Sequence, residues 1–223
     1  MQLSSKKYFA EGDIKSVNLF MFFLLIFHCF FLSALSDNVL TIYSRVSFNL
    51  IIITSFFSVE KEFRGISGPA IAIAFITYWL AYFFDKDFIV VISSVLLAIV
   101  FIITVFNLLR QVASKKTVSA DTLIQAISGY LLIGIVFSLL FTLIIRVNPE
   151  SVNFAMNKGD GNNVVILDTL YFTFISLATV GYGDFLPVSP FARSMSAFMG
   201  ITGQIYIATV IALLIGKFSS SKT

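Results

Sequence analysis

The sequence predicts an all-α membrane protein, from its composition and from the spacing of its charged residues. Hydrophobic residues make up 58% and charged residues 12% of the 223 residues, which is about half the charged share of an ordinary soluble domain. The mean hydropathy is +0.95. This composition excludes a disordered chain and a typical soluble enzyme. The net charge of +3 is too small to indicate nucleic-acid binding, and the single cysteine, Cys29, excludes a disulfide within one chain.

Five uncharged stretches are long enough to cross a bilayer, which takes about 20 helical residues. They are residues 16–36, 65–84, 88–109, 122–145 and 194–216. The uncharged stretch between Arg45 and Glu60 is shorter. We expect it to cross as residues 39–59, with Arg45 reaching the headgroups along its apolar stem. Six crossings follow.

A seventh uncharged stretch lies between Asp168 and Asp184 and is too short to cross. It contains two glycines and is expected to enter the membrane and return on the same side. Non-helical backbone at that depth is tolerated only where protein or a watery cavity satisfies its polar groups. The stretch therefore predicts a pore or a binding site.

The placement of lysine and arginine in the short loops predicts the orientation. If the amino terminus is cytoplasmic, most of the 15 basic residues lie on the inner side. Both termini of a multi-pass protein in the cell membrane are then cytoplasmic. Residues 110–120 are expected to form an interfacial linker helix on anionic headgroups, and the Asn- and Gly-rich residues 146–167 an outer turret.

Residues 179–183 read T-V-G-Y-G, the sequence of the selectivity filter of potassium channels. Residues 121–223 resemble the pore domain of the tetrameric potassium channels in their order of outer helix, turret, pore helix, filter and inner helix. The whole layout is similar to the six-transmembrane, voltage-gated-like superfamily. The resemblance implies a potassium-selective channel that conducts passively, with no enzymatic activity and no cofactor.

The resemblance also assigns roles in the filter, where oxygens must replace the water around a dehydrated ion. It implies K⁺ coordination by the carbonyls of Thr179, Val180, Gly181 and Tyr182 and by the Thr179 hydroxyl. Alternating backbone handedness is expected, and Gly181 and Gly183 adopt positive φ without a Cβ penalty. Gly183 and Asp184 would form the outer mouth, where the carboxylate concentrates cations. Val180 and Tyr182 are expected to face away from the ion and pack on the pore helix.

Residues 168–178 are the expected pore helix, with Asp168 as its N-cap. Tyr171 and Phe172 lie where the family often has an aromatic pair. The chain departs from the family at Ile175, where some bacterial members carry a glutamate, and at Ala178, a frequent threonine. Both departures bear on filter inactivation and leave cation selectivity intact.

The last helix, residues 193–216, is expected to line the inner cavity. Gly203 matches the family's hinge glycine, but small residues also allow close helix packing, and the two interpretations stand equal. At the outer end Arg193 either contacts an anionic lipid or only reaches the headgroups. The predicted cavity and gate residues share one helix face, which could instead merely pack on the outer helix; they are Gln204, Ile207, Ile211 and Ile215.

Residues 1–109 are expected to form a four-helix domain that is similar in layout to a voltage sensor. Sensing requires mobile charge, typically 3–4 charges per subunit, whereas residues 88–109 contain no lysine or arginine. We therefore expect weak or no voltage dependence. Residues 110–120 and 121–223 complete the organisation as linker and pore domain.

One filter strand supplies one side of each oxygen ring, so the resemblance implies a homotetramer in which each chain has three identical partners, in contact with membrane lipids. Three alternatives remain open: a non-selective cation channel, a potassium-transporter subunit, and a non-conducting regulatory or scaffold subunit. The sequence does not identify the gating stimulus.

Overall fold

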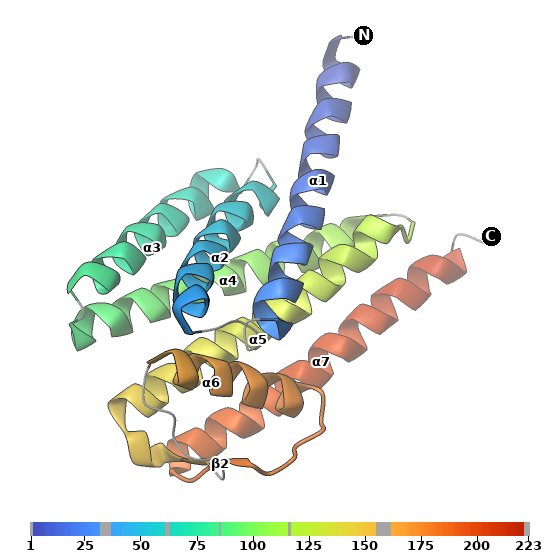
Figure 1. Cartoon of the computed structure of the whole chain (residues 1–223). Helices are drawn as coiled ribbons and strands as arrows, with labels where there is room; N and C mark the ends of the chain where they lie inside the picture. Colours follow the sequence, from blue (N-terminus) through green and yellow to red (C-terminus); the bar gives the residue numbers. More distant parts are fainter. Residues whose placement is uncertain are drawn as a thin grey trace.

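The computed structural model describes residues 2–31, 37–60, 63–84, 86–115, 117–154 and 162–220. The described chain is nearly all helical, as predicted, with one short pair of strands (Figure 1). In chain order the elements are α1 (Gln2–Phe30), α2 (Asp37–Ser58), α3 (Arg64–Phe84), α4 (Asp87–Ser114), α5 (Ala120–Val147), η2 (Pro149–Ser151), β1 (Val152–Phe154), α6 (Asn162–Leu177), β2 (Phe185–Pro187) and α7 (Pro190–Ser220).

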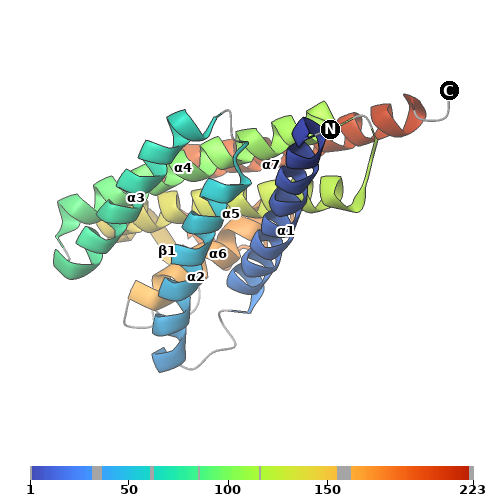
Figure 2. The same cartoon turned by 90° about the horizontal axis from the view of Figure 1, so that it is seen from above.

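Helix α5 is the centre of the molecule (Figures 1 and 2). It packs along α4 and against α1 on one side, and against α6 and α7 on the other. Helix α3 covers α4, and α2 packs on α1. The largest fully buried side chains follow this arrangement, because Phe101 and Leu108 on α4 and Leu132, Ile135 and Phe141 on α5 have almost no exposed surface.

Four described helices are long and apolar enough to span a membrane: Ser67–Phe84, Asp87–Ser114, Ala120–Val147 and Pro190–Ser219. They correspond to four of the six predicted crossings. The other two predicted crossings fall in α1 and α2, whose described apolar parts are shorter, Lys15–Phe30 and Ile42–Ser58. The predicted re-entrant stretch contains a third shorter apolar helix, Val165–Leu177.

The predicted linker helix over residues 110–120 is wrong. Nothing between Arg110 and Ser114 breaks a helix, and α4 continues through Ser114. Helix α5 then begins at Ala120, after an N-cap at Ser119. The Ser119 side chain accepts from the backbone N–H of Thr122 while the Thr122 side chain accepts from the Ser119 N–H, a reciprocal cap that fixes the start of the helix. The connection between α4 and α5 is thus short and non-helical where it is described.

The predicted start of the pore helix is also wrong. Helix α6 begins at Asn162, because the apolar run Val164–Leu167 continues the helix upstream of the expected cap. Asp168 consequently lies inside α6 and is not its N-cap. Partial burial there raises the pKa of its carboxyl, since desolvation disfavours the charged form. Residues 155–161 of the predicted turret lie outside the described part of the chain.

Candidate functional site

Helix α6 is set closely against α5. A Cβ placed on Gly134 of α5 would lie 2.4 Å from the ring of Phe174, so only glycine admits this approach. A buried hydroxyl cluster lies further along the same contact. Thr169 Oγ1 lies 2.9 Å from Ser138 Oγ and 3.0 Å from Thr142 Oγ1. Such hydroxyls link helices in an apolar surrounding, and together these contacts fix the position of α6.

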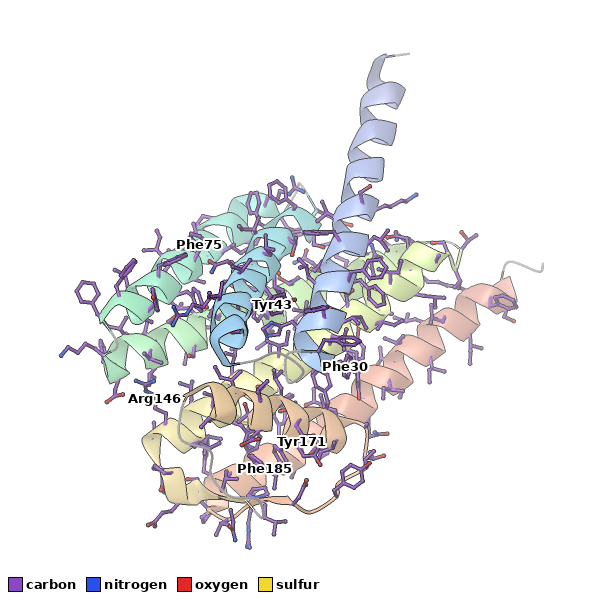
Figure 3. All side chains as sticks on the ribbon, viewed as in Figure 1. Phe30, Tyr43, Phe75, Arg146, Tyr171 and Phe185 are labelled. Carbon is purple, nitrogen blue, oxygen red and sulfur yellow. The ribbon has the colours of Figure 1, made fainter. Side chains whose placement is uncertain are left out.

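Aromatic rings carry the packing from α6 to the strand that follows it. The rings of Phe172 on α6 and Phe185 on β2 stack at 4.2 Å between centroids, and Phe141 of α5 meets Phe172 edge-on at 4.8 Å. All three side chains are buried. Figure 3 shows Phe185 beside Tyr171 below α6. The end of the loop between α6 and β2, residues 178–184, is therefore held by buried aromatic packing of Phe185.

The N–H groups at the start of this loop bond to the end of α6. Both Val180 N–H and Gly181 N–H donate to the carbonyl of Ile175, at 2.8 and 3.2 Å, and Thr179 N–H donates to Ser176 O at 3.0 Å. These bonds satisfy carbonyls that a helix end leaves without intrahelical partners. The N–H groups of Thr179, Val180 and Gly181 are therefore all bonded to α6.

The backbone of the loop alternates in handedness. Gly181 and Gly183 have φ of 55° and 80°, which confirms the predicted left-handed conformation at both glycines. Thr179 also has a positive φ, 60°, and it is the non-glycine residue of the described chain with this conformation. Its conformation was not predictable from the sequence, because a β-branched residue at positive φ is unusual. A backbone of alternating handedness turns successive peptide groups toward the same side.

The predicted packing of Tyr182 on the pore helix is not found within the single chain. Tyr182 is 71% exposed and Val180 51% exposed. The loop runs along the edge of the molecule below α6 (Figure 1). Burial of Val180 and Tyr182 on a pore helix would require a neighbouring chain.

Asp184, which follows the loop, is bonded to Tyr171 of α6. Tyr171 Oη donates to Asp184 Oδ2 at 2.6 Å, and the other carboxylate oxygen, Oδ1, is buried without a hydrogen-bond partner. The bond to Asp184 is the main reason that the pKa of the Tyr171 hydroxyl rises to about 12. Both residues were candidates from the sequence, but their contact was not predicted.

A short antiparallel sheet fixes the chain after Asp184. Strand β1 pairs with β2 in the register Val152 to Pro187 and Phe154 to Phe185. Beyond the strands, Val188 N–H donates to Ser151 O at 2.8 Å. These strands were not predicted, because three-residue strands are too short to show an alternation of apolar and polar residues.

Helix α7 crosses the end of α6 at Gly203. A Cβ on Gly203 would lie 2.7 Å from Leu177 Cδ2 and 3.3 Å from Leu177 O, which supports close packing for this glycine. On the predicted gate face, Gln204, Ile211 and Ile215 are exposed and Ile207 is half-buried in the single chain. At the outer end Arg193 is exposed, and its Nε donates to Pro187 O at 3.5 Å.

One α7 contact was not predicted. Buried Tyr206 donates from Oη to the carbonyl of Ala126 on α5 at 2.6 Å. A Cβ on Gly129 of α5 would lie 2.2 Å from the same oxygen, so the ring fits only over a glycine. The sequence around Ala126 and Gly129 gives no sign of this contact, because Tyr206 lies far along the chain.

Comparisons with known proteins cover the part of the chain that contains this site. Residues 133–220, which include the end of α5, α6, the loop and α7, match a family described as "Ion channel". The chain is 27% identical over 117 residues to a protein named "Potassium channel K1" from Plasmodium berghei (strain Anka), over 52% of this chain and 6% of the relative. The chain thus spans only a small part of the curated relative that it matches, and no solved structure matches it significantly. The match to this family and the apolar helices together indicate a membrane protein.

Proposed function

We propose that the chain is a subunit of a potassium-selective channel that passes K⁺ down its gradient. The observation that carries the proposal is the loop at residues 179–183. The N–H groups of Thr179, Val180 and Gly181 bond to α6, and φ is positive at Thr179, Gly181 and Gly183 but not at Val180 and Tyr182 between them. This arrangement leaves carbonyls free to replace the hydration shell of a cation. Thr179, Val180, Gly181 and Tyr182 would supply these oxygens, and the Thr179 hydroxyl would add the innermost one.

A single chain presents the loop from one side only, so the proposal includes four identical chains around one axis. The exposure of Val180 and Tyr182 supports it, because an apolar and an aromatic side chain at the loop surface fit a contact with a neighbouring loop and pore helix. The exposed face of α7, with Gln204, Ile211 and Ile215, would line the cavity below, where isoleucines can form a constriction that closes by dewetting.

Asp184 would lie at the outer mouth beside Gly183 and raise the local cation concentration. The relative is named as a potassium channel, which supports potassium as the permeant ion. The proposal also retains six crossings with both termini cytoplasmic. Helix α4 carries no basic residue from Phe88 to Leu109, and we therefore propose weak or no voltage dependence.

The decisive experiment measures K⁺ and Na⁺ flux through the purified protein in liposomes, stepped across voltage. Potassium flux well above sodium flux is expected, and Gly181→Asp should abolish it because a charged side chain enters the loop. Equal sodium flux would identify a non-selective cation channel, and coupled, saturable flux a transporter subunit. A folded protein that passes no potassium would be a regulatory or scaffold subunit. Steep activation by voltage would refute the account of α4.

A further inference from the structure

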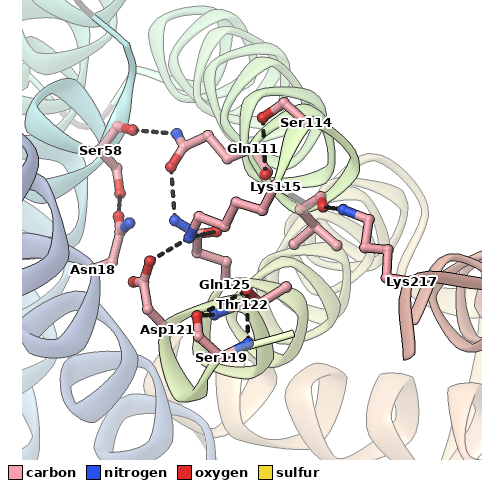
Figure 4. Close-up of polar contacts among 11 residues, drawn as sticks. Asn18, Ser58, Gln111, Ser114, Lys115, Ser119, Asp121, Thr122, Gln125 and Lys217 are labelled. Carbon is pink, nitrogen blue, oxygen red and sulfur yellow. Dashed lines mark hydrogen bonds and ion pairs between the residues drawn. The ribbon is translucent and has the colours of Figure 1, made fainter. Parts of the chain in front are cut away.

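The inner end of α7 is bonded to the last turn of α4, far from the predicted filter. Lys217 Nζ donates to the carbonyl of Ala113 at 3.0 Å and to the carbonyl of Val112 (Figure 4). The last four carbonyls of an α-helix lack intrahelical partners, and a cation is favourable at the negative end of the helix dipole. The ammonium of Lys217, on α7, therefore caps the carboxyl end of α4.

The end of α4 is itself fixed by a buried polar network (Figure 4). Gln111 Nε2 donates to Ser58 O of α2 at 2.8 Å, and Gln125 Nε2 of α5 donates to Gln111 Oε1 at 2.7 Å. The Ser58 hydroxyl bonds in turn to Asn18 of α1. Gln111 and Gln125 are almost fully buried, so breaking these bonds leaves polar groups without water. Lys217 thus bonds to the end of α4, which buried hydrogen bonds link to α2 and α5.

A second cation completes the connection between α4 and α5. Lys115 forms an ion pair with Asp121 and donates to Gln125 Oε1 at 2.9 Å. At the opposite end of the same helix pair, Arg146 Nε donates to Asp87 Oδ1 at 2.9 Å. With the short connection between Ser114 and Ala120, these contacts make α4 and α5 antiparallel neighbours within one chain. The bond between Lys217 of α7 and the end of α4 is accordingly formed within one chain.

We propose that Lys217 is a positioning residue that holds the inner end of α7 against α4 of the same chain and so keeps the pore open; this rests on the proposed channel function. Lys217 follows Ile215, the innermost residue of the predicted constriction, by two positions. Two positions correspond to about 200° around an α-helix, so Lys217 bonds to α4 from the side of α7 opposite to Ile215, and the bond draws the helix end away from the expected axis. The four-helix domain without gating charges then acts as a fixed brace.

A crosslinking experiment tests the contact without any need for conduction. In a Cys29→Ala background, Ala113→Cys and Lys217→Cys are combined and treated in liposomes with a short bifunctional thiol reagent. Ala113 is exposed and Lys217 partly exposed, so both positions are accessible. We expect a crosslink within one chain, which migrates as a monomer on a denaturing gel and is located by peptide mapping. Crosslinked dimers, or the absence of any crosslink, would overturn the proposal.

A flux experiment tests the positioning role. Lys217→Met keeps the apolar stem and removes the donors to Val112 O and Ala113 O. It should lower steady K⁺ flux by up to about tenfold, because the loss of hydrogen bonds to a charged group shifts a two-state equilibrium by at least that factor. The ratio of K⁺ to Na⁺ flux should stay unchanged, because the filter is untouched. Lys217→Arg, which keeps the donors, should restore most of the flux.

Lys86→Met is the matched control, since this exposed lysine caps α4 at its other end without a side-chain bond. It should behave like the unmodified protein. If Lys217→Met equals this control, or if Lys217→Arg is as impaired as Lys217→Met, the positioning role is refuted. If the unmodified protein itself fails to conduct, the proposed function fails, while the crosslinking result still decides whether α7 is held by its own α4.

Discussion

The hydroxyl of Tyr171 donates to Asp184 Oδ2 at 2.6 Å and thereby ties the middle of α6 to the residue that follows the loop. The loop is anchored at its other end by the Ile175 carbonyl, which accepts from Val180 and Gly181. One helix therefore sets the position of both ends of residues 179–183. Residues 179–183 contain the three positive φ angles.

Removal of the Tyr171 hydroxyl is expected to weaken the outer anchor without unfolding the protein. In Tyr171→Phe the ring remains, and Asp184, whose Oδ1 is already buried without a partner, loses its bond at Oδ2. We expect K⁺ flux that begins near the unmodified level and declines faster with time, together with a nearly unchanged thermal midpoint. Tyr82→Phe, an exposed tyrosine on α3, is the control. Identical time courses for the two variants would show that the bond does not support the loop.

The same bond predicts how the anchor depends on pH. Acceptance by Asp184 raises the pKa of Tyr171 from 10 to about 12 in the folded chain. A raised pKa means that the bond contributes fully below pH 10 and is lost as the pH rises through about 12. Flux should therefore show no Tyr171-dependent change between neutral pH and pH 10. The measurement compares the decline of K⁺ flux in unmodified protein and in Tyr171→Phe from neutral pH to pH 10. The difference between the two should stay constant over this range, and its disappearance below pH 10 would contradict the prediction.

The sequence predicted much of the fold because long apolar stretches without charge have one stable solution in a membrane. Four of the predicted crossings coincide with α3, α4, α5 and α7. Helix ends were less predictable, since they depend on local caps and on runs such as Val164–Leu167. The positive φ at both glycines followed from their lack of a Cβ, whereas Thr179 adopts it against its own preference.

Contacts between distant segments of the chain were beyond the reach of the sequence. Tyr206 and Ala126 lie on different helices, and nothing in either local sequence marks the bond. The same holds for Lys217, whose letter alone predicts only a cytoplasmic cation at a helix end. Packing geometry creates these contacts, so only the three-dimensional structure identifies them.

A Cβ at Gly181 is expected to damage conduction more than folding. The left-handed conformation costs a non-glycine residue about 1–2 kcal/mol, and no atom lies within 4 Å of the added methyl within the chain. Gly181→Ala should therefore retain helix content and solubility in detergent but lose most K⁺ flux, as the carbonyl turns. Gly65→Ala, which also meets nothing within 4 Å and has no positive φ, is the control. A conducting Gly181→Ala would separate the φ angle from function.

The contact between Gly129 and Tyr206 predicts a clash that a second substitution relieves. In Gly129→Ala the new methyl would lie 2.2 Å from Tyr206 Oη and 3.2 Å from Cζ. The ring must move and lose its bond to Ala126 O, so we expect a loss of about 1–3 kcal/mol of stability from overpacking. Removing the hydroxyl removes the closer of these contacts. Gly129→Ala with Tyr206→Phe should accordingly unfold at a higher temperature than Gly129→Ala alone, and additive losses would contradict the geometry.

Gly203 and Gly200 of α7 allow close packing and hinge motion to be separated. A Cβ on Gly203 would press on Leu177, whereas one on Gly200 meets nothing within 4 Å in the chain. Gly200→Ala should be neutral or gain about 0.5–1 kcal/mol from helix propensity, while overpacking in Gly203→Ala should cost about 1–3 kcal/mol. Thermal unfolding in detergent measures both.

The fully buried Leu177 provides the test of cause. Leu177→Ala alone removes packing and destabilises α6, but combined with Gly203→Ala it makes room for the new methyl. We therefore expect the double variant to be more stable than the sum of the two single losses, a coupling that arises only between groups in contact. If Gly203 acts as a hinge instead, Gly203→Ala retains its thermal stability and alters K⁺ flux alone. In that case adding Leu177→Ala does not restore the K⁺ flux of Gly203→Ala, because the space beside residue 203 does not affect how easily the backbone bends.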